Sequence, residues 1–155
     1  MRVIDMPSHK WRKRFRGSGS RWTASREAIL NLLSRTSKHL SAKEIYRSLF
    51  RIYPGIGLTT VYRTLDVLEK MGYLNKIPLG TGENKYELIT NSSRNHHHHL
   101  ICTQCGKVID YTDFVDEELE LIKKTEQRLK KKHGFKITDH NFEFYGICKE
   151  CQKRR

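Results

Sequence analysis

The cysteines of this chain most restrict the fold that it can adopt. All four occur as two Cys-x-x-Cys pairs far apart in the sequence: Cys102 with Cys105, and Cys148 with Cys151. Four thiolates in two such pairs match a closed tetrahedral zinc site, with Zn–S bonds of about 2.3 Å and no open position for a substrate. Because the pairs are far apart, a helix and a strand must bring the second back to the first. The sequence therefore predicts a structural zinc that joins the two ends of one domain.

Two disulfides are the alternative use of the same cysteines. Disulfides persist in oxidising compartments, whereas residues 1–16 are basic and contain no apolar run that would export the chain. No stretch approaches the roughly 20 apolar residues that span a bilayer. We therefore expect a soluble, cytoplasmic protein with zinc-bound thiolates and no membrane partner.

Four consecutive histidines precede the first cysteine pair. Residues 98–102 are typical of a short strand, in which alternate side chains point to opposite faces. His97 and His99 would then share one face, and His96 and His98 the other, so that one strand could contribute to two metal sites. A solvated polar run or a purification tag is the alternative, although a tag normally lies at a terminus.

Charge is distributed unevenly along the 155 residues. Residues 1–78 contain 16 Lys and Arg against 5 Asp and Glu, and residues 79–155 contain 14 against 12. A half this basic favours a polyanionic partner, and nucleic acid is expected rather than a membrane because no amphipathic anchor helix is evident. The length suits one or two small domains rather than a large enzyme cleft.

Three helices and a hairpin are predicted in the basic half. Apolar spacing predicts helices over residues 25–35, from a capping box at residue 41, and over residues 58–71. Strands are expected over 73–78 and 85–89, around a turn with glycines. This is the order of a winged helix, whose third helix enters the major groove. The outward face at the start of that helix offers hydroxyls, an aromatic ring and a guanidinium to DNA: Thr59, Thr60, Tyr62, Arg63 and Thr64.

The first 22 residues combine Lys and Arg with Trp11, Phe15 and Trp22, and a Gly-Ser-Gly-Ser piece at residues 17–20 is expected to be a flexible link. A disordered, solvated tail and a DNA-contacting arm are equally expected for this stretch.

A small α/β domain is predicted for the C-terminal half. Strands are expected over residues 98–102 and 107–111, a helix with one apolar stripe over 114–132, and a last strand over 135–147. One helix and a few strands bury little apolar surface, so a two-fold dimer is expected to complete the core. The expected fold class is α+β, with an N-terminal winged-helix DNA-binding domain over residues 1–90 and a C-terminal α/β metal-binding dimerisation domain over residues 91–155.

Three segments make the chain resemble a known family. They are Leu-Thr-Thr-Val-Tyr-Arg-Thr-Leu at 58–65, the histidine and cysteine block at 96–110, and Asp-His followed by Tyr-Gly-Ile-Cys at 139–148. Over about residues 21–151 the chain resembles the ferric uptake regulator family of metal-sensing bacterial repressors. The resemblance implies a homodimer that, when loaded with metal, binds A/T-rich inverted repeats in double-stranded DNA. It also implies a basic residue that enters the minor groove, here Arg21.

The resemblance further implies three sets of metal ligands. The four cysteines would hold the structural Zn²⁺. The ligands implied for the sensing site, which would bind Fe²⁺, Zn²⁺ or Mn²⁺, are His39, Glu87, His97, His99 and Asp110. An alignment by spacing alone would place Asn91, and not Glu87, at the position where the relatives have the carboxylate ligand. A possible further site, rich in nitrogen and so suited to zinc or another late transition metal, consists of His96, His98, Glu117 and His140.

Several functions compete. Ferrous iron is the expected signal, and a zinc-uptake regulator is the runner-up because most nitrogen and oxygen sites prefer zinc to iron. Peroxide-sensing relatives share Asp110 but have aspartate where this chain has Glu87, so a peroxide-responsive repressor ranks third. A zinc-dependent hydrolase would need an open coordination position and a general base. No His-Glu-x-x-His helix or nucleophile elbow occurs, so no enzyme is expected. A constitutive nucleic-acid-binding protein would bind DNA regardless of chelators.

Overall fold

The computed structural model describes residues 11–13, 15, 21–89, 97–138 and 140–154. The chain divides into two compact units, Met1–Asn91 and Ser92–Arg155, and each is described by itself. The Gly-Ser link expected at 17–20 lies outside the described residues. Among the helices that the structure describes, none has the length and apolar character needed to cross a membrane.

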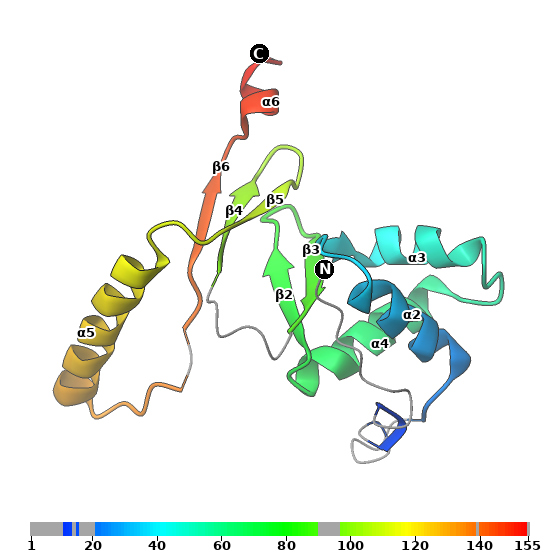
Figure 1. Cartoon of the computed structure of the whole chain (residues 1–155), viewed down its shortest axis with the longest axis horizontal. Helices are drawn as coiled ribbons and strands as arrows, with labels where there is room; N and C mark the ends of the chain where they lie inside the picture. Colours follow the sequence, from blue (N-terminus) through cyan, green and yellow to red (C-terminus); the bar gives the residue numbers. More distant parts are fainter. Residues whose placement is uncertain (1–10, 14, 16–20, 90–96, 139, 155) are drawn as a thin grey trace. The chain divides into compact units, whose positions relative to one another are not determined.

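The described part of the first unit combines three helices with a three-stranded antiparallel sheet (Figure 1). The sheet has the order β1-β3-β2, so the hairpin strands β2 and β3 pair along their length and β1 adds to the outer edge of β3. Its elements are α2 (Ala24–Ser34), β1 (Leu40–Ser41), α3 (Ala42–Phe50), α4 (Leu58–Lys70), β2 (Leu74–Pro78) and β3 (Asn84–Leu88).

Local side chains set where these helices begin. Thr23 caps α2, because its hydroxyl oxygen accepts the backbone N–H of Arg26 at 3.3 Å. The predicted capping box opens α3: Ser41 Oγ accepts the N–H of Glu44 at 3.2 Å, and the Glu44 carboxylate accepts the N–H of Ser41 at 2.7 Å. Helix α4 starts after the extended residue Gly57. These caps place each apolar stripe on the inner side of the unit.

The core of the first unit lies where the three helices meet. Ile29 of α2, Ile45 of α3 and Val61 and Leu65 of α4 are all 0% exposed. Burial of each aliphatic side chain contributes roughly 1.5–3 kcal/mol relative to leaving it in water. The inner face of α4 is therefore fixed, and its outer face is held in a defined orientation.

Strand β4 is the centre of the second unit. Its sheet has the order β5-β4-β6, with β5 antiparallel and β6 parallel to β4, as the arrow directions in Figure 1 show. Helix α5 connects β5 to the segment before β6, and α6 follows β6. The elements are β4 (His98–Cys102), β5 (Val108–Tyr111), α5 (Val115–His133), β6 (Glu143–Gly146) and α6 (Lys149–Gln152).

The last strand is much shorter than predicted. A strand was expected over residues 135–147, but only Glu143–Gly146 pairs with a neighbour, and that neighbour is β4. Alternating apolar residues suggest a strand even where no partner backbone is present, and Phe135 is 69% exposed. The short helix α6 was not predicted, because a four-residue helix has too few positions to show a period.

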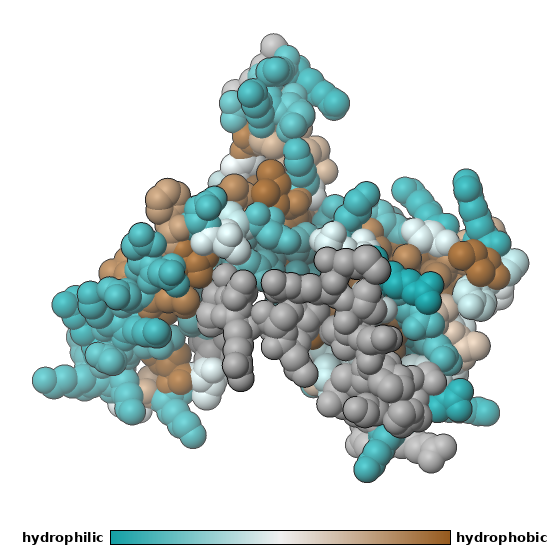
Figure 2. All heavy atoms as spheres, viewed as in Figure 1, coloured by the Kyte–Doolittle hydropathy of each residue, from teal (hydrophilic) through white to brown (hydrophobic). Residues whose placement is uncertain are grey.

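A row of apolar side chains crosses the outer face of this sheet. Leu100 of β4 lies opposite Ile109 of β5 and beside Phe144 of β6. The three side chains are 42%, 42% and 47% exposed, and Figure 2 shows apolar residues gathered over this sheet and along one side of α5. Val115 is the sole buried residue among those of α5. This unit therefore leaves apolar surface that a second copy of the chain is expected to cover.

Candidate functional site

The first cysteine pair lies on a tight turn at the end of β4. Cys102 is the last residue of the strand, and Cys105 lies in the turn. The turn closes because the Gly106 N–H donates to the Cys102 carbonyl and the Cys102 N–H donates to the Lys107 carbonyl, both at 2.9 Å. Gly106 has a φ of 68°, a left-handed conformation that glycine adopts without steric penalty.

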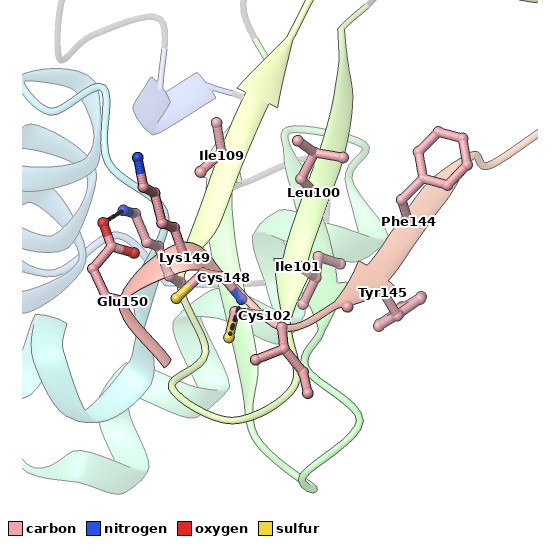
Figure 3. Close-up of a pocket in the computed structure, with 12 residues that line it drawn as sticks. Leu100, Ile101, Cys102, Ile109, Phe144, Tyr145, Cys148, Lys149 and Glu150 are labelled. Carbon is pink, nitrogen blue, oxygen red and sulfur yellow. Dashed lines mark hydrogen bonds and ion pairs between the residues drawn. The ribbon is translucent and has the colours of Figure 1, made fainter. Parts of the chain in front are cut away.

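Parallel pairing of β6 with β4 brings the second cysteine pair to the first. Cys102 lies opposite Gly146 in this pairing, and Cys148 follows two residues later as the cap of α6, which contains Cys151. The backbone N–H of Cys148 donates to Cys102 Sγ at 3.3 Å (Figure 3). A helix and a strand, α5 and β6, therefore lie between the two cysteine pairs as the spacing predicts, although β6 is only four residues long.

The four thiols fit a zinc ion. Their sulfur atoms all lie within 4.8 Å of one another, and Cys105 Sγ is 3.8 Å from Cys148 Sγ. A regular tetrahedron with Zn–S bonds of about 2.3 Å has sulfurs about 3.8 Å apart. All four cysteines are free thiols in the structure. The geometry thus matches the closed, structural zinc site that the sequence predicts.

Backbone hydrogen bonds prepare one of these cysteines for metal binding. The N–H groups of Cys148 and Cys105 stabilise the Cys102 thiolate and lower the pKa of Cys102 to about 6. The thiol of Cys148 is hydrogen-bonded to Cys151, and this contact raises the pKa of Cys151 to about 12. Zinc binding would displace the protons that the cysteine thiols otherwise carry.

In the first unit, a buried histidine pairs with a half-buried carboxylate. His39 precedes β1 and is 7% exposed, and its Nε2 lies 3.1 Å from Glu87 Oε2 on β3. The other oxygen of Glu87 accepts a hydrogen bond from Asn75 Nδ2 on β2 at 2.9 Å. His39 is therefore not the surface histidine that the sequence would suggest by itself. Asn91, the alternative carboxylate position, lies outside the described residues.

In the second unit, two histidines and an aspartate lie on one face of β4 and β5. The rings of His97 and His99 have their centroids 5.1 Å apart. Asp110 lies opposite His99 in the strand register, and its Oδ1 is 3.7 Å from His99 Nε2. His97 and His99 thus share a side, as the strand alternation predicts.

His98 points to the other face and meets a carboxylate that the sequence did not single out. Its Nδ1 lies 2.5 Å from Glu118 Oε2, and the Tyr111 hydroxyl donates to both oxygens of that carboxylate, at 3.1 and 3.3 Å. Burial and the bond to Glu118 raise the pKa of Tyr111 to about 12. Glu117, the predicted ligand, is exposed. The structure therefore places Glu118, and not the predicted Glu117, beside His98.

The rotation of α5 about its axis explains why Glu118, and not Glu117, meets His98. Val115 is the buried residue at the start of α5, and residues three apart share a helix face. Glu118 therefore lies on the inner face with Val115, whereas Glu117 is rotated away. The phase of the apolar stripe could have identified Glu118. Of the other residues predicted for the further site, His140 Nδ1 lies 3.2 Å from Glu126 Oε1, and His96 is outside the described residues.

A pair of neighbouring variants tests which carboxylate serves the His98 face. If metal enters this face, Glu118→Gln is expected to weaken its binding about tenfold or more, because the ligand charge is lost and the partner of His98 changes. Glu117→Gln removes the same charge one residue away and should leave the affinity unchanged. Chelator competition measures the metal affinity of both variants in protein that retains its four-cysteine zinc. Weaker metal binding in Glu117→Gln alone would show that Glu117, and not Glu118, serves the His98 face.

The outer face of α4 presents most of the predicted DNA-contacting residues. Thr59, Tyr62 and Arg63 are exposed, with Tyr62 at 41%, and Thr60 is half-buried. Thr64 is 0% exposed, and its hydroxyl donates to the Thr60 carbonyl at 2.7 Å. The prediction that Thr64 contacts DNA is therefore wrong, because it lies on the inner side of the helix with Val61 and Leu65.

Arg21, the residue expected in the minor groove, is exposed just before the Thr23 cap of α2. The guanidinium of Arg26 donates to the backbone carbonyl of Arg21. Two lysines of the hairpin lie close to carboxylates: Lys76 Nζ is 3.8 Å from Glu69, and Lys85 Nζ is 3.9 Å from Glu44.

The apolar row of the second unit borders a groove of about 320 Å³ (Figure 3). Leu100, Ile109 and Phe144 line one side, and Cys148, Lys149 and Glu150 line the end near the zinc site. The groove contains no catalytic constellation: its one ion pair among the described residues joins Lys107 to Glu150 at 3.3 Å. Its apolar walls fit the expected dimer interface better than a substrate.

Known proteins match this chain over nearly its whole length. A model of the Ferric uptake regulator family matches residues 17–145. The chain is 37% identical to the ferric uptake regulation protein of Bacillus subtilis (strain 168) over 141 residues, which cover 90% of this chain and 91% of that protein. It is 33% identical to the peroxide-responsive repressor PerR of Staphylococcus saprophyticus over 139 residues, which cover 90% and 87%.

A solved structure extends the likeness to three dimensions. The Helicobacter pylori ferric uptake regulator Fur, described as having three functional metal binding sites, superposes with a TM-score of 0.74 at 27% identity. The superposition covers 98% of this chain and 97% of that chain. The similarity therefore includes both units and not the winged helix alone.

Proposed function

We propose that ferrous iron is the signal sensed by this chain, which belongs to the ferric uptake regulator family. Members of this family are metal-responsive transcriptional repressors and not enzymes, and they act as DNA-binding dimers. This chain is accordingly a metal-dependent repressor of α+β fold that uses a structural zinc and a regulatory divalent metal. The identity of the regulatory metal, the ligands that hold it, and the DNA sequence are the substance of the proposal.

The partly buried pair of His39 and Glu87 is the observation that most supports a sensing site. A histidine and a carboxylate 3.1 Å apart supply two ligands, which is fewer than a regulatory metal needs. The second unit supplies the complement on one face of its sheet: His97, His99 and Asp110. We propose that the two groups hold the same ion. Nitrogen and oxygen donors of this kind suit ferrous iron.

Sharing one ion between two units explains how metal changes DNA affinity. A ligand shifts a conformational equilibrium only if it binds one state better than the other. His39 and Glu87 belong to the unit with α4, and His99 belongs to the unit that we propose to dimerise. When both sets bind one ion, the orientation of each α4 relative to the dimer becomes fixed. Two recognition helices then face successive turns of an A/T-rich inverted repeat. We place the protein in the cytoplasm, where it would reach its operator.

Arg63→Ala is expected to weaken operator binding by about 1–3 kcal/mol, which is roughly 5-fold to 150-fold, without changing metal content. The guanidinium is exposed on the outer face of α4, so its removal leaves the core intact. Lys70→Ala is the matched control, because it removes a cation from the other end of the same helix. Anisotropy of a labelled operator duplex measures both variants. Equal affinity of Arg63→Ala and the native protein would exclude this face of α4 as the reading surface.

The proposed signal is tested with protein that retains only its four-cysteine zinc. Anisotropy of a labelled A/T-rich palindromic duplex is followed anaerobically while free Fe²⁺, or separately free Zn²⁺, is raised through buffered concentrations. Binding switched on by micromolar Fe²⁺, with zinc required only for folding, is the expected result. Equal binding without added metal would refute the metal switch.

A zinc-uptake regulator is the second candidate, and the family's metal chemistry favours it specifically. Nitrogen and oxygen sites generally bind zinc more tightly than iron, so availability in the cell decides which metal is sensed. In the same titration, activation by zinc at much lower free concentration, with iron ineffective, would replace iron by zinc as the signal. A peroxide-responsive role ranks behind both, because Glu87 stands where peroxide-sensing relatives are expected to have aspartate.

A further inference from the structure

Two aromatic side chains near the N-terminus are packed into the core of the first unit. Trp11 is 6% exposed and Phe15 is 0% exposed, and both belong to the buried cluster formed by α2, α3 and α4. The Trp11 ring meets Tyr73 edge-on with centroids 5.0 Å apart, and the Phe15 ring meets Trp22 in the same way at 5.2 Å. The described part of this segment is therefore anchored, and is not a solvated tail.

The residues between these anchors present positive charge to solvent. Trp11 and Phe15 are four residues apart, and such positions share one face of a helical turn. Arg12 and Lys13 lie off that face and are exposed. No ion pair joins either of them to another residue in the described ranges. The anchors thus fix two uncompensated cations on the surface of the winged helix.

Arg26 of α2 links this segment to the backbone of Arg21. The guanidinium carbon of Arg26 lies 5.4 Å from the centroid of the Phe15 ring, and this guanidinium donates to the Arg21 carbonyl. Partial burial lowers the pKa of Arg26 from its ordinary value. Phe15 also packs on Trp22, the neighbour of Arg21. The anchored segment and the residue expected in the minor groove are therefore parts of one packed surface.

Charge indicates the kind of partner that this surface fits. The first 22 residues contain seven Lys and Arg and a single acidic residue, Asp5. Duplex DNA has one negative charge about every 1.7 Å along its axis, and cations held in place bind its phosphates without reading base sequence. The surface is also continuous with the proposed DNA-binding face through Arg21. Both observations favour DNA over an acidic protein.

We propose that Trp11 and Phe15 anchor a second DNA contact, in which Arg12 and Lys13 bind backbone phosphates beside the minor groove that receives Arg21. This inference rests on the proposed DNA-binding function and extends it. Phosphate contacts add affinity equally to all sequences, whereas α4 discriminates between them. The anchored segment would increase the grip on DNA without changing which operator is chosen.

The double variant Arg12→Gln/Lys13→Gln removes the two charges. It is expected to weaken binding at about 0.1 M salt by roughly tenfold or more, by the same factor on the operator and on a scrambled duplex. Each lost phosphate contact takes about 0.9 from the slope of log affinity against log salt, so a dimer should lose up to about 3.6. The matched control is Lys131→Gln/Lys132→Gln, which removes two exposed charges from α5 and should change neither quantity.

A second double variant separates an anchored contact from a tail that acts through charge alone. Trp11→Ala/Phe15→Ala keeps every charge but removes both anchors, and we expect it to lose the same part of the salt slope. Trp11→Phe keeps an aromatic anchor and should retain native binding, and thermal unfolding checks that each variant is folded. A folded Trp11→Ala/Phe15→Ala protein with the native slope would refute the anchoring.

The remaining outcomes are equally decisive. If Arg12→Gln/Lys13→Gln binds both duplexes like the α5 control, the second DNA contact does not exist, even though the winged helix binds DNA. If the native, metal-loaded protein binds no duplex at all, the proposed function itself has failed. The two failures are therefore distinguishable in one series of anisotropy measurements.

Discussion

Replacing Cys148 by serine is expected to unfold the second unit and abolish the dimer. Cys148 supplies one of four zinc ligands, and its backbone N–H also donates to Cys102 Sγ. Structural zinc contributes an apparent 10–16 kcal/mol or so in small zinc domains, whereas whole domains are stable by only about 5–15 kcal/mol. Among the described residues of this unit, the buried apolar ones, apart from two of the cysteines, are Ile101 and Val115. Such a core is too small to compensate for the lost ligand.

Gln104→Ser is the matched control for this variant. Gln104 is exposed in the same turn and offers no thiolate. The Gln104→Ser protein should therefore keep its native zinc content and remain a dimer. Zinc released to a colorimetric chelator, light scattering after size exclusion, and near-ultraviolet circular dichroism report metal, oligomer and packing. A Cys148→Ser protein that keeps one tight zinc per chain and stays dimeric would contradict the four-cysteine site.

His39→Ala is expected to uncouple DNA binding from metal while leaving the four-cysteine zinc in place. The substitution removes one of the two sensing ligands proposed in the DNA-binding unit and leaves the Glu87 carboxylate without the histidine 3.1 Å away. Coupling between two sites typically amounts to 1–3 kcal/mol, or about 5-fold to 150-fold in affinity. That whole increment should disappear, so that added Fe²⁺ no longer strengthens operator binding.

Anaerobic anisotropy with and without Fe²⁺ measures the loss. His133→Ala is the control, because it removes an exposed histidine from the last turn of α5 and should preserve the metal response. Thermal unfolding is recorded for both proteins, since His39 is buried and its removal leaves a small cavity. A folded His39→Ala protein with the full native response would exclude His39 from the sensing site.

Local sequence signals were sufficient for most of the first unit, although the two-residue strand β1 was not predicted. The Ser41 and Glu44 capping box, the apolar period of residues 58–71 and the glycines of the hairpin each act within a few residues of chain. The observed elements α3, α4, β2 and β3 follow from them closely. The failure at Thr64 has a simple cause. The buried face of an amphipathic helix is about 100° wide or more. Thr64 lies at the edge of this face but still on its buried side, where its hydroxyl donates to the Thr60 carbonyl.

Partner-dependent features of the second unit were harder to predict. The strand expected over residues 135–147 needed a neighbouring backbone, and β4 pairs with only four residues of it. Glu117 and Glu118 are adjacent acidic residues with the same composition signal, and only the rotation of α5 decides which one meets His98. Tyr111 was not considered, because a single tyrosine in a strand has no motif of its own. The two N-terminal alternatives also depended on packing, which the Trp11 and Phe15 contacts supply.

The sequence by itself determined the chemistry of this protein: four cysteines in two pairs, a run of histidines, a basic N-terminal half and the helix periods of a winged helix. Ligand types and short-range periods are local properties, so they can be read without knowing the neighbours. Only the tertiary structure decided which groups meet. The parallel pairing of β6 with β4 brings Cys148 to Cys102, and the pairing of β1 with β3 brings His39 to Glu87. These meetings join residues distant in sequence, and long-range backbone pairing and packing set them.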